Sequence, residues 1–72
     1  MIFKWEPGSE ISAGIEKGKT VIRANRAGLL SLANHLRALA EEEGPSHFHL
    51  DPYNSLEEGS AELIIEKLQD PE

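Results

Sequence analysis

One amphipathic segment in the middle of the chain constrains the fold more than any other feature. It begins after Asn25, a residue type that caps helices well, and it ends at Gly44 and Pro45, which stop them. Between these limits the apolar residues recur with the period of an α-helix, so the pattern predicts one long helix laid on a sheet by a single face. The residues expected on that face are Leu29, Leu32, Ala33, Leu36 and Ala40, with Leu30 and Leu39 widening it.

Short β-favouring stretches precede the helix. Residues 2–6 contain Ile, Phe and Trp and predict a first strand, which Pro7 and Gly8 end. Residues 11–15 alternate weakly, and residues 20–24 hold adjacent β-branched side chains. Because a Lys-Gly-Lys turn signal separates the last two stretches, we expect them to form a hairpin around Gly18.

Two further strands are expected after the helix, at residues 47–50 and 61–66. The acidic connector between them, residues 51–60, is rich in turn residues, and Tyr53 and Leu56 are apolar enough to pin it to the domain. Alternation assigns the side chains of the two strands to two faces. His47 and His49 fall on the polar face, and the core face is expected to hold Phe48, Leu50, Ala61, Leu63 and Ile65.

The sum of these elements is an α+β fold. We expect residues 1–72 to form a single small domain, in which one long helix packs on one face of a single-layer sheet of four to five strands, in the order ββ(β)-α-ββ. The other face of such a sheet stays partly open, and Phe3, Trp5 and Ile64 could lie there. An exposed apolar face of this kind marks a contact with a partner or with a second copy of the chain.

Charge divides the chain into unlike halves. The net charge is −6; residues 1–40 carry six basic and three acidic groups, whereas residues 41–72 carry one basic and ten acidic groups. The acidic half disfavours nucleic-acid binding, because phosphates need cations, and favours a basic protein partner. The alternative is that the acids only keep a small protein soluble.

Composition also bears on the compartment. The chain has no cysteine, and no run of residues approaches the length of a membrane span or of a signal-peptide apolar region. We therefore expect a cytoplasmic protein, monomeric or homodimeric, without a membrane partner.

Catalytic and metal chemistry find little support. His47, His49 and Asp51 are metal-ligand types on one strand, but the remaining histidine, His35, lies on the helix and is expected on the opposite side of the sheet. There is no nucleophile elbow and no phosphate-binding glycine loop. We expect no enzyme activity, no cofactor and no metal site, with a small metal-dependent enzyme as the least favoured alternative.

Two acidic groups are the candidate partner-binding residues. Glu41, Glu42 and Glu43 are expected in the last turn of the helix, where the helix dipole opposes negative charge. Asp51, Glu57 and Glu58 lie in the connector. These six carboxylates predict an acidic surface for a cationic protein; solvated acids with screened charges are the simpler interpretation.

Three segments together resemble a known family. They are residues 25–33 (NRAGLLSLA), residues 47–51 (HFHLD) and residues 56–66 (LEEGSAELIIE), and in this order and spacing they resemble immunity protein family 32 of bacterial polymorphic toxin systems. The resemblance covers about residues 20 to 66. It implies an α+β fold and a protein that binds and neutralises a cognate toxin, and it brings no catalytic residues. The alternative is a small regulatory or structural domain that acts as a homodimer.

Overall fold

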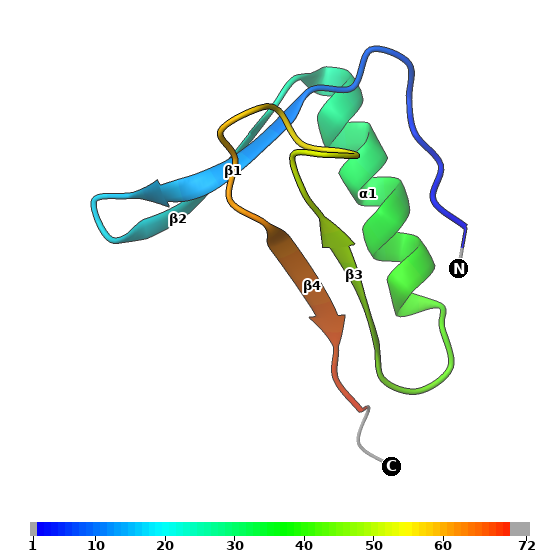
Figure 1. Cartoon of the computed structure of the whole chain (residues 1–72). Helices are drawn as coiled ribbons and strands as arrows, with labels where there is room; N and C mark the ends of the chain where they lie inside the picture. Colours follow the sequence, from blue (N-terminus) through cyan, green and yellow to red (C-terminus); the bar gives the residue numbers. More distant parts are fainter. Residues whose placement is uncertain (1, 70–72) are drawn as a thin grey trace.

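The first hairpin follows directly from its turn. In the computed structural model, which describes residues 2–69, β1 (Ile11–Glu16) pairs antiparallel with β2 (Lys19–Ala24). Lys17 and Gly18 join them with φ values of 52° and 77°. Positive φ at both central residues is what the tight two-residue hairpin turn requires, and glycine adopts it without steric cost. The predicted hairpin around Gly18 is confirmed (Figure 1).

Asn25 starts the helix and ties it to the chain before β1. Helix α1 (Arg26–Ala40) begins where the Asn25 Oδ1 accepts a hydrogen bond from the Gly28 N–H at 2.7 Å. The same oxygen accepts the Glu10 N–H at 3.1 Å, and the Asn25 Nδ2 donates to the Gly8 carbonyl at 2.9 Å. The predicted N-cap is confirmed, and one amide side chain joins the first turn of the helix to the segment before β1.

The helix ends earlier than its sequence suggests. It stops at Ala40 with Glu41 as its C-cap, so the expected continuation to the Gly44–Pro45 stop is wrong. The acidic triplet Glu41–Glu43 therefore follows the helix and does not form its last turn. Negative charge in that turn would face the negative end of the helix dipole, which favours an early end.

The buried face of α1 also differs from the expected one. Among the apolar residues that the helical period predicts on the buried face, Leu32 is buried, whereas Leu29 and Leu36 are 57% and 46% exposed. The face is rotated by about one residue, because Gly28 packs against the start of β1 and because the segment before β1 covers Ser31 and His35. The helix residues that are buried are Gly28, Ser31, Leu32, His35 and Leu39.

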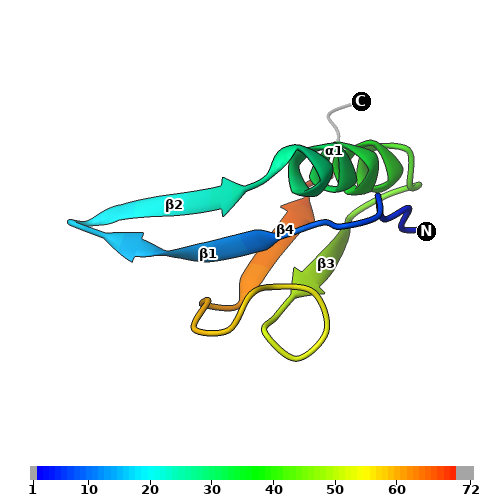
Figure 2. The ribbon, with the colours of Figure 1, turned by 90° about the horizontal axis from the view of Figure 1, so that it is seen from above.

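The prediction of a single sheet of four to five strands is wrong. β3 (Ser46–Leu50) pairs antiparallel with β4 (Leu63–Lys67), and this pair forms its own two-stranded sheet, separate from β1 and β2. Figure 2 shows the first hairpin extending away from α1 while β3 and β4 lie below the helix. The free edge of β1 receives the connector instead of a strand, which is why the two sheets do not merge. The α+β class itself is confirmed.

The expected first strand is not formed. Residues 2–6 are an irregular segment that runs along α1, and Phe3 and Trp5 pack on His35 with ring-centroid distances of 4.8 and 4.2 Å. Phe3 also meets Phe48 edge-on at 5.2 Å, so both aromatic side chains belong to the core side and not to the open face. Ile64 does lie on the open face, 52% exposed and in register with His49.

The core is small and sits where α1 crosses the two hairpins. The faces predicted for β3 are confirmed, since Phe48 and Leu50 are buried and His47 and His49 are exposed. On the last strand Leu63 and Ile65 are half-buried against the core, but Ala61 is exposed and precedes β4. The buried apolar residues are Ile11, Ala13, Leu32, Leu39, Phe48, Leu50 and Leu56.

Candidate partner-binding surface

The structure divides the six candidate carboxylates between two ends of the molecule. Asp51, Glu57 and Glu58 lie in the connector, beside β1, and Glu41–Glu43 lie past the far end of α1, in the link to β3 (Figure 1). The helix and β3 run between the two groups. The six residues therefore form two separate acidic regions, which we call the connector end and the helix end.

Asp51 organises the connector from within. Its carboxylate oxygen Oδ1 accepts the Tyr53 and Asn54 N–H groups at 2.9 and 3.2 Å, and its carbonyl accepts the Ser55 and Leu56 N–H groups at 3.0 and 2.9 Å. This is the local turn that an aspartate side chain builds with the backbone that follows it. The turn drives Leu56 into the core, as expected, but leaves Tyr53 98% exposed, so the second expected anchor is wrong.

The second half of the connector is fixed to the free edge of β1. The Glu57 N–H donates to the Ile11 carbonyl and the Ala61 N–H donates to the Ala13 carbonyl, both at 2.8 Å. The Ser60 hydroxyl accepts the Ala13 N–H at 3.2 Å. Backbone contacts of this kind hold Glu57 and Glu58 in fixed positions, although both side chains are exposed.

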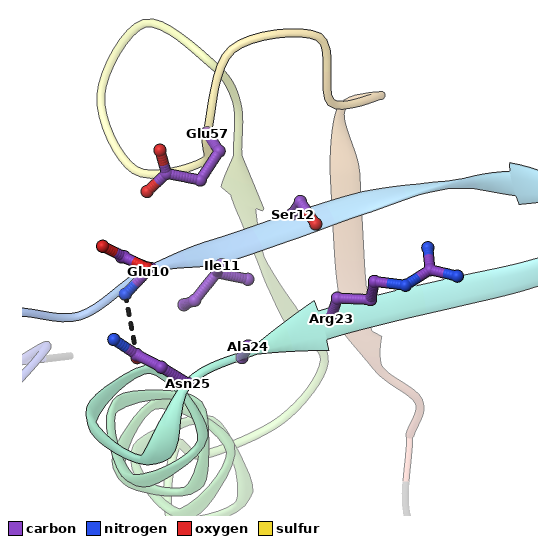
Figure 3. Close-up of a pocket in the computed structure, with 7 residues that line it drawn as sticks. All are labelled: Glu10, Ile11, Ser12, Arg23, Ala24, Asn25 and Glu57. Atoms are coloured by element: carbon purple, nitrogen blue, oxygen red, sulfur yellow. Dashed lines mark hydrogen bonds between the residues drawn. The ribbon is translucent and has the colours of Figure 1, made fainter.

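Two shallow hollows lie between the connector and the first hairpin. One has a volume of about 240 Å³ and is bordered by Glu10, Ser12 and Glu57; the other has about 220 Å³ and is bordered by Glu16, Glu58 and Ser60. Both are smaller than the 300–1,000 Å³ or so of typical small-molecule sites. Figure 3 shows the side chains of Glu10 and Glu57 on the same side of the first hollow, with the Arg23 guanidinium extending away from them.

Arg23 borders both hollows, but its charge is already matched. Its guanidinium forms a two-pronged ion pair with the Glu16 carboxylate across the hairpin. The hydrogen bonds that Arg23 donates to the Glu16 carboxylate lower the pKa of Glu16 and raise the pKa of Arg23. The structure gives Glu10, Glu57 and Glu58 no ion pair with any residue among 2–69. The connector end is therefore locally negative.

Sequence reasoning missed Glu10. It precedes β1 and is far from the connector along the chain, and the docking of the connector on β1 brings it beside Glu57. No sequence signal identifies this neighbour, because the contact depends on tertiary packing alone.

The helix end contains a compensating cation that sequence reasoning also missed. The Lys67 ammonium donates hydrogen bonds to the Ala40 carbonyl, at 3.2 Å, and to the Glu42 carbonyl. It thus satisfies backbone oxygens past the end of α1 and brings a positive charge to the negative end of the helix dipole. One sequence signal could have pointed to this role, since Lys67 is the single basic residue of the acidic half, residues 41–72.

Replacing Lys67 with methionine should test this role. The variant keeps most of the apolar stem but loses the charged donor, and hydrogen bonds to charged groups are worth about 1.5–3 kcal/mol. Since Lys67 is only half-buried, we expect a loss near the lower end of that range, read as a lower midpoint in urea unfolding. Lys19→Met, on the exposed part of the hairpin, is the matched control and should change the midpoint little. Equal midpoints for the Lys67 variant and the native chain would contradict the capping role.

The histidines do not gather. The His47 and His49 rings lie 4.9 Å apart on the outer face of β3, and the His49 Nδ1 is 3.4 Å from a Glu62 carboxylate oxygen. His35 packs on Phe48 at the other face of β3, and that opposite placement was predicted; its full burial was not. Within residues 2–69 no group of three or more His, Cys, Asp or Glu side chains is arranged to hold a metal ion.

Comparisons with known proteins point to one family. The family model described as Immunity protein 32 matches residues 19–68, from the first residue of β2 to the residue after β4. Neither the curated proteins nor the solved structures gave a match. In the described part of the chain, α1 is too short and too polar to cross a membrane, and no other helix is present.

Proposed function

The chain belongs to the immunity protein 32 family, and from this membership we propose that it is a non-catalytic protein that binds a cognate bacterial toxin and neutralises it. The match to residues 19–68 carries the proposal, because it includes the first hairpin's second strand, α1, the connector and β4. An inhibitor of this kind needs a rigid, complementary surface and not an enclosed pocket. We place its action in the cytoplasm, where a toxin would otherwise reach its target.

The connector end is the contact surface that we favour. Glu57 and Glu58 of the connector end, with Glu10 beside them, present three exposed carboxylates that have no ion pair among the described residues. Two of them stand on backbone that is hydrogen-bonded to β1, so little conformational entropy is lost when a partner orders them. At the helix end, by contrast, Lys67 brings a positive charge close to Glu42.

A locally negative surface of this kind suits a basic partner. Opposite charges speed the encounter of two proteins and orient them, and this acceleration falls as salt screens the charges. A toxin that acts on nucleic acid needs a cationic site, and blocking that site with carboxylates would inhibit it.

The test measures binding to a candidate toxin domain, which is to be sought among the genes that neighbour the one for this protein. We expect the double variant Glu57→Lys with Glu58→Lys to associate at least about tenfold more slowly at low salt, and to lose most of the salt dependence of the association rate. Stopped-flow fluorescence at about 20 and 150 mM salt gives both quantities, because the Debye length changes severalfold over that range.

The control carries the same change in net charge at another place. Glu62 and Glu66 lie at the outer face of the second sheet, and reversing both leaves the connector end intact. We expect this control to retain most of the native association rate. If the two double variants slow association equally, net charge and not the connector end determines binding. A third variant that reverses Glu41 and Glu43 separates the helix end from the connector end.

A further inference from the structure

The folded chain is more open than a protein of its size should be. Its accessible surface is 5435 Å², whereas a folded monomer of 8.0 kDa exposes about 4,450 Å². Its radius of gyration is 12.9 Å, against about 11 Å for 72 residues in a closed domain. The excess surface, about 1,000 Å², is similar to the roughly 800 Å² that each partner buries in a stable protein–protein interface.

Part of this surface is apolar and belongs to the first hairpin. Ile15 and Ile22 lie on the same face of the hairpin as the buried Ile11 and Ala13, because side chains alternate along both strands. Beyond the core that face continues uncovered, with Ile15 75% and Ile22 43% exposed. The hairpin thus presents the extension of its core face to solvent.

The second part belongs to one flank of α1. Ser31 and Asn34 hydrogen-bond the segment before β1, the first to the Glu6 N–H and the second to the Lys4 carbonyl. At about 100° per residue, Leu29 and Leu36 point about 140° to 160° away from these two residues, so they lie on the opposite flank. Figures 1 and 2 show the N-terminal segment on one side of α1 and the first hairpin and β4 on the other.

We propose that a second copy of this chain covers this apolar flank, which we define as Ile15, Ile22, Leu29 and Leu36. The proposal goes beyond toxin binding and does not depend on it. The excess area of the single chain is about what each half of a stable dimer needs. The four side chains of this flank are among the ten large apolar side chains that the described residues leave exposed, and exposed apolar surface marks an interaction site. By forming a dimer, a domain of this size also buries apolar surface that its own small core cannot cover.

Charge distribution favours a copy of the same chain as the occupant. The hairpin tip is basic through the exposed Lys17 and Lys19, whereas Glu41, Glu43 and Glu66 make the far part of the molecule acidic. In a two-fold dimer the same contact occurs twice, so the basic tip of each protomer can meet the acidic part of its partner. Within the described residues β2 pairs only with β1 and β4 only with β3, so each of these two strands keeps one unpaired edge that a partner strand could use.

The test is the mass of the intact chain in solution as a function of concentration. Sedimentation equilibrium should give twice the 8.0 kDa of one chain at high concentration, with dissociation on dilution. Leu36→Glu should raise the dimer dissociation constant at least about tenfold, because it places a charge in a desolvated interface. Leu30→Glu is the matched control, since Leu30 is similarly exposed, 41% against 46%, but points about 120° away from Leu36 on the same helix.

Each outcome decides the matter. Dissociation by Leu36→Glu and by Ile22→Glu on the hairpin, with a native dissociation constant for Leu30→Glu, supports the proposal; circular dichroism confirms that each variant is folded. A mass of 8.0 kDa at every concentration up to about 0.5 mM overturns it, because an interface of the standard size binds far more tightly. Equal dissociation by Leu30→Glu and Leu36→Glu also overturns it, since the interface would then not be this flank.

Discussion

Replacing Gly28 with alanine is expected to destabilise the fold by about 3 kcal/mol, at the upper end of what overpacking a core usually does. A Cβ at this position would lie 2.4 Å from the Glu10 carbonyl oxygen, 2.9 Å from the Ile11 Cγ1 and 3.0 Å from the Ala24 Cβ. The nearest neighbour is backbone, which cannot rotate away, so α1 must move off β1. Alanine's better helix propensity, about 1 kcal/mol, offsets only part of this loss.

Urea unfolding followed by circular dichroism measures the effect. Domains of this size have about 4–10 kcal/mol of stability, so the midpoint should fall by a large fraction of its native value. Gly14→Ala is the control: Gly14 lies in β1, has no atom within 4 Å of an added Cβ, and should change stability by no more than about 1 kcal/mol. A native midpoint for the Gly28 variant would show that α1 does not rest against β1 through this glycine.

The second large effect is expected from acid, through His35. The side chain is fully buried among Phe3, Trp5 and Phe48, and both ring nitrogens lack a hydrogen-bond partner among residues 2–69. Burial lowers the pKa of His35 below its ordinary value of 6.5, and no charged group contributes to that shift. The neutral ring is tolerated in this apolar cluster, whereas the imidazolium would lose its hydration without a partner.

The sign of the pH dependence follows from the direction of this shift. Because the unfolded chain binds the His35 proton more tightly, the free energy of unfolding is highest above pH 6.5 and falls as the pH drops through 6.5 towards the lower pKa of the folded state. One proton changes stability by at most about 1.4 kcal/mol per pH unit. We therefore expect a loss of up to about 2 kcal/mol between pH 6.5 and pH 5.

His35→Leu should remove this dependence and leave the chain at least as stable at pH 7, since two unpartnered polar atoms disappear from the core. The measurement is the urea midpoint at several pH values from 7.5 to 5, above the range in which most carboxylates titrate. His49→Gln, on the exposed face of β3, is the control and should keep the native pH profile. If the leucine variant and the native chain lose stability equally over this range, another group carries the titration.

The two predictions concern residues whose roles the sequence does not reveal. In the sequence, Gly28 is an ordinary residue at the start of a helix. In the structure, its lack of a side chain makes room for the Glu10 carbonyl. His35 was compared with His47 and His49 as a metal ligand, yet it is a core residue enclosed by Phe3 and Trp5. Both roles arise between segments that are distant in the chain, and no local pattern encodes such a contact.

Elements that depend on short-range physics were predicted well. The first hairpin follows from the Lys17-Gly18 turn, the start of α1 from the Asn25 cap, and the faces of β3 from alternation of side chains. In each of these cases the residues that decide the structure are within a few positions of one another. The candidate carboxylates of the connector were selected in the same way, as charged residues in an acidic loop, and their role in binding stays a prediction.

Tertiary packing decided the rest. Which flank of α1 is buried depends on the fit of Gly28 against β1 and on the aromatic segment that covers His35, and so the apolar stripe read from the period of the helix was displaced. The connector, and not a strand, occupies the free edge of β1 through hydrogen bonds from Glu57 and Ala61, which keeps the two sheets apart. The sequence by itself determined the first hairpin, the start of α1, the faces of β3, the charge asymmetry and the family resemblance. Only the tertiary structure decided which carboxylates are neighbours and which apolar flank is left uncovered, because both depend on contacts between residues far apart in the chain.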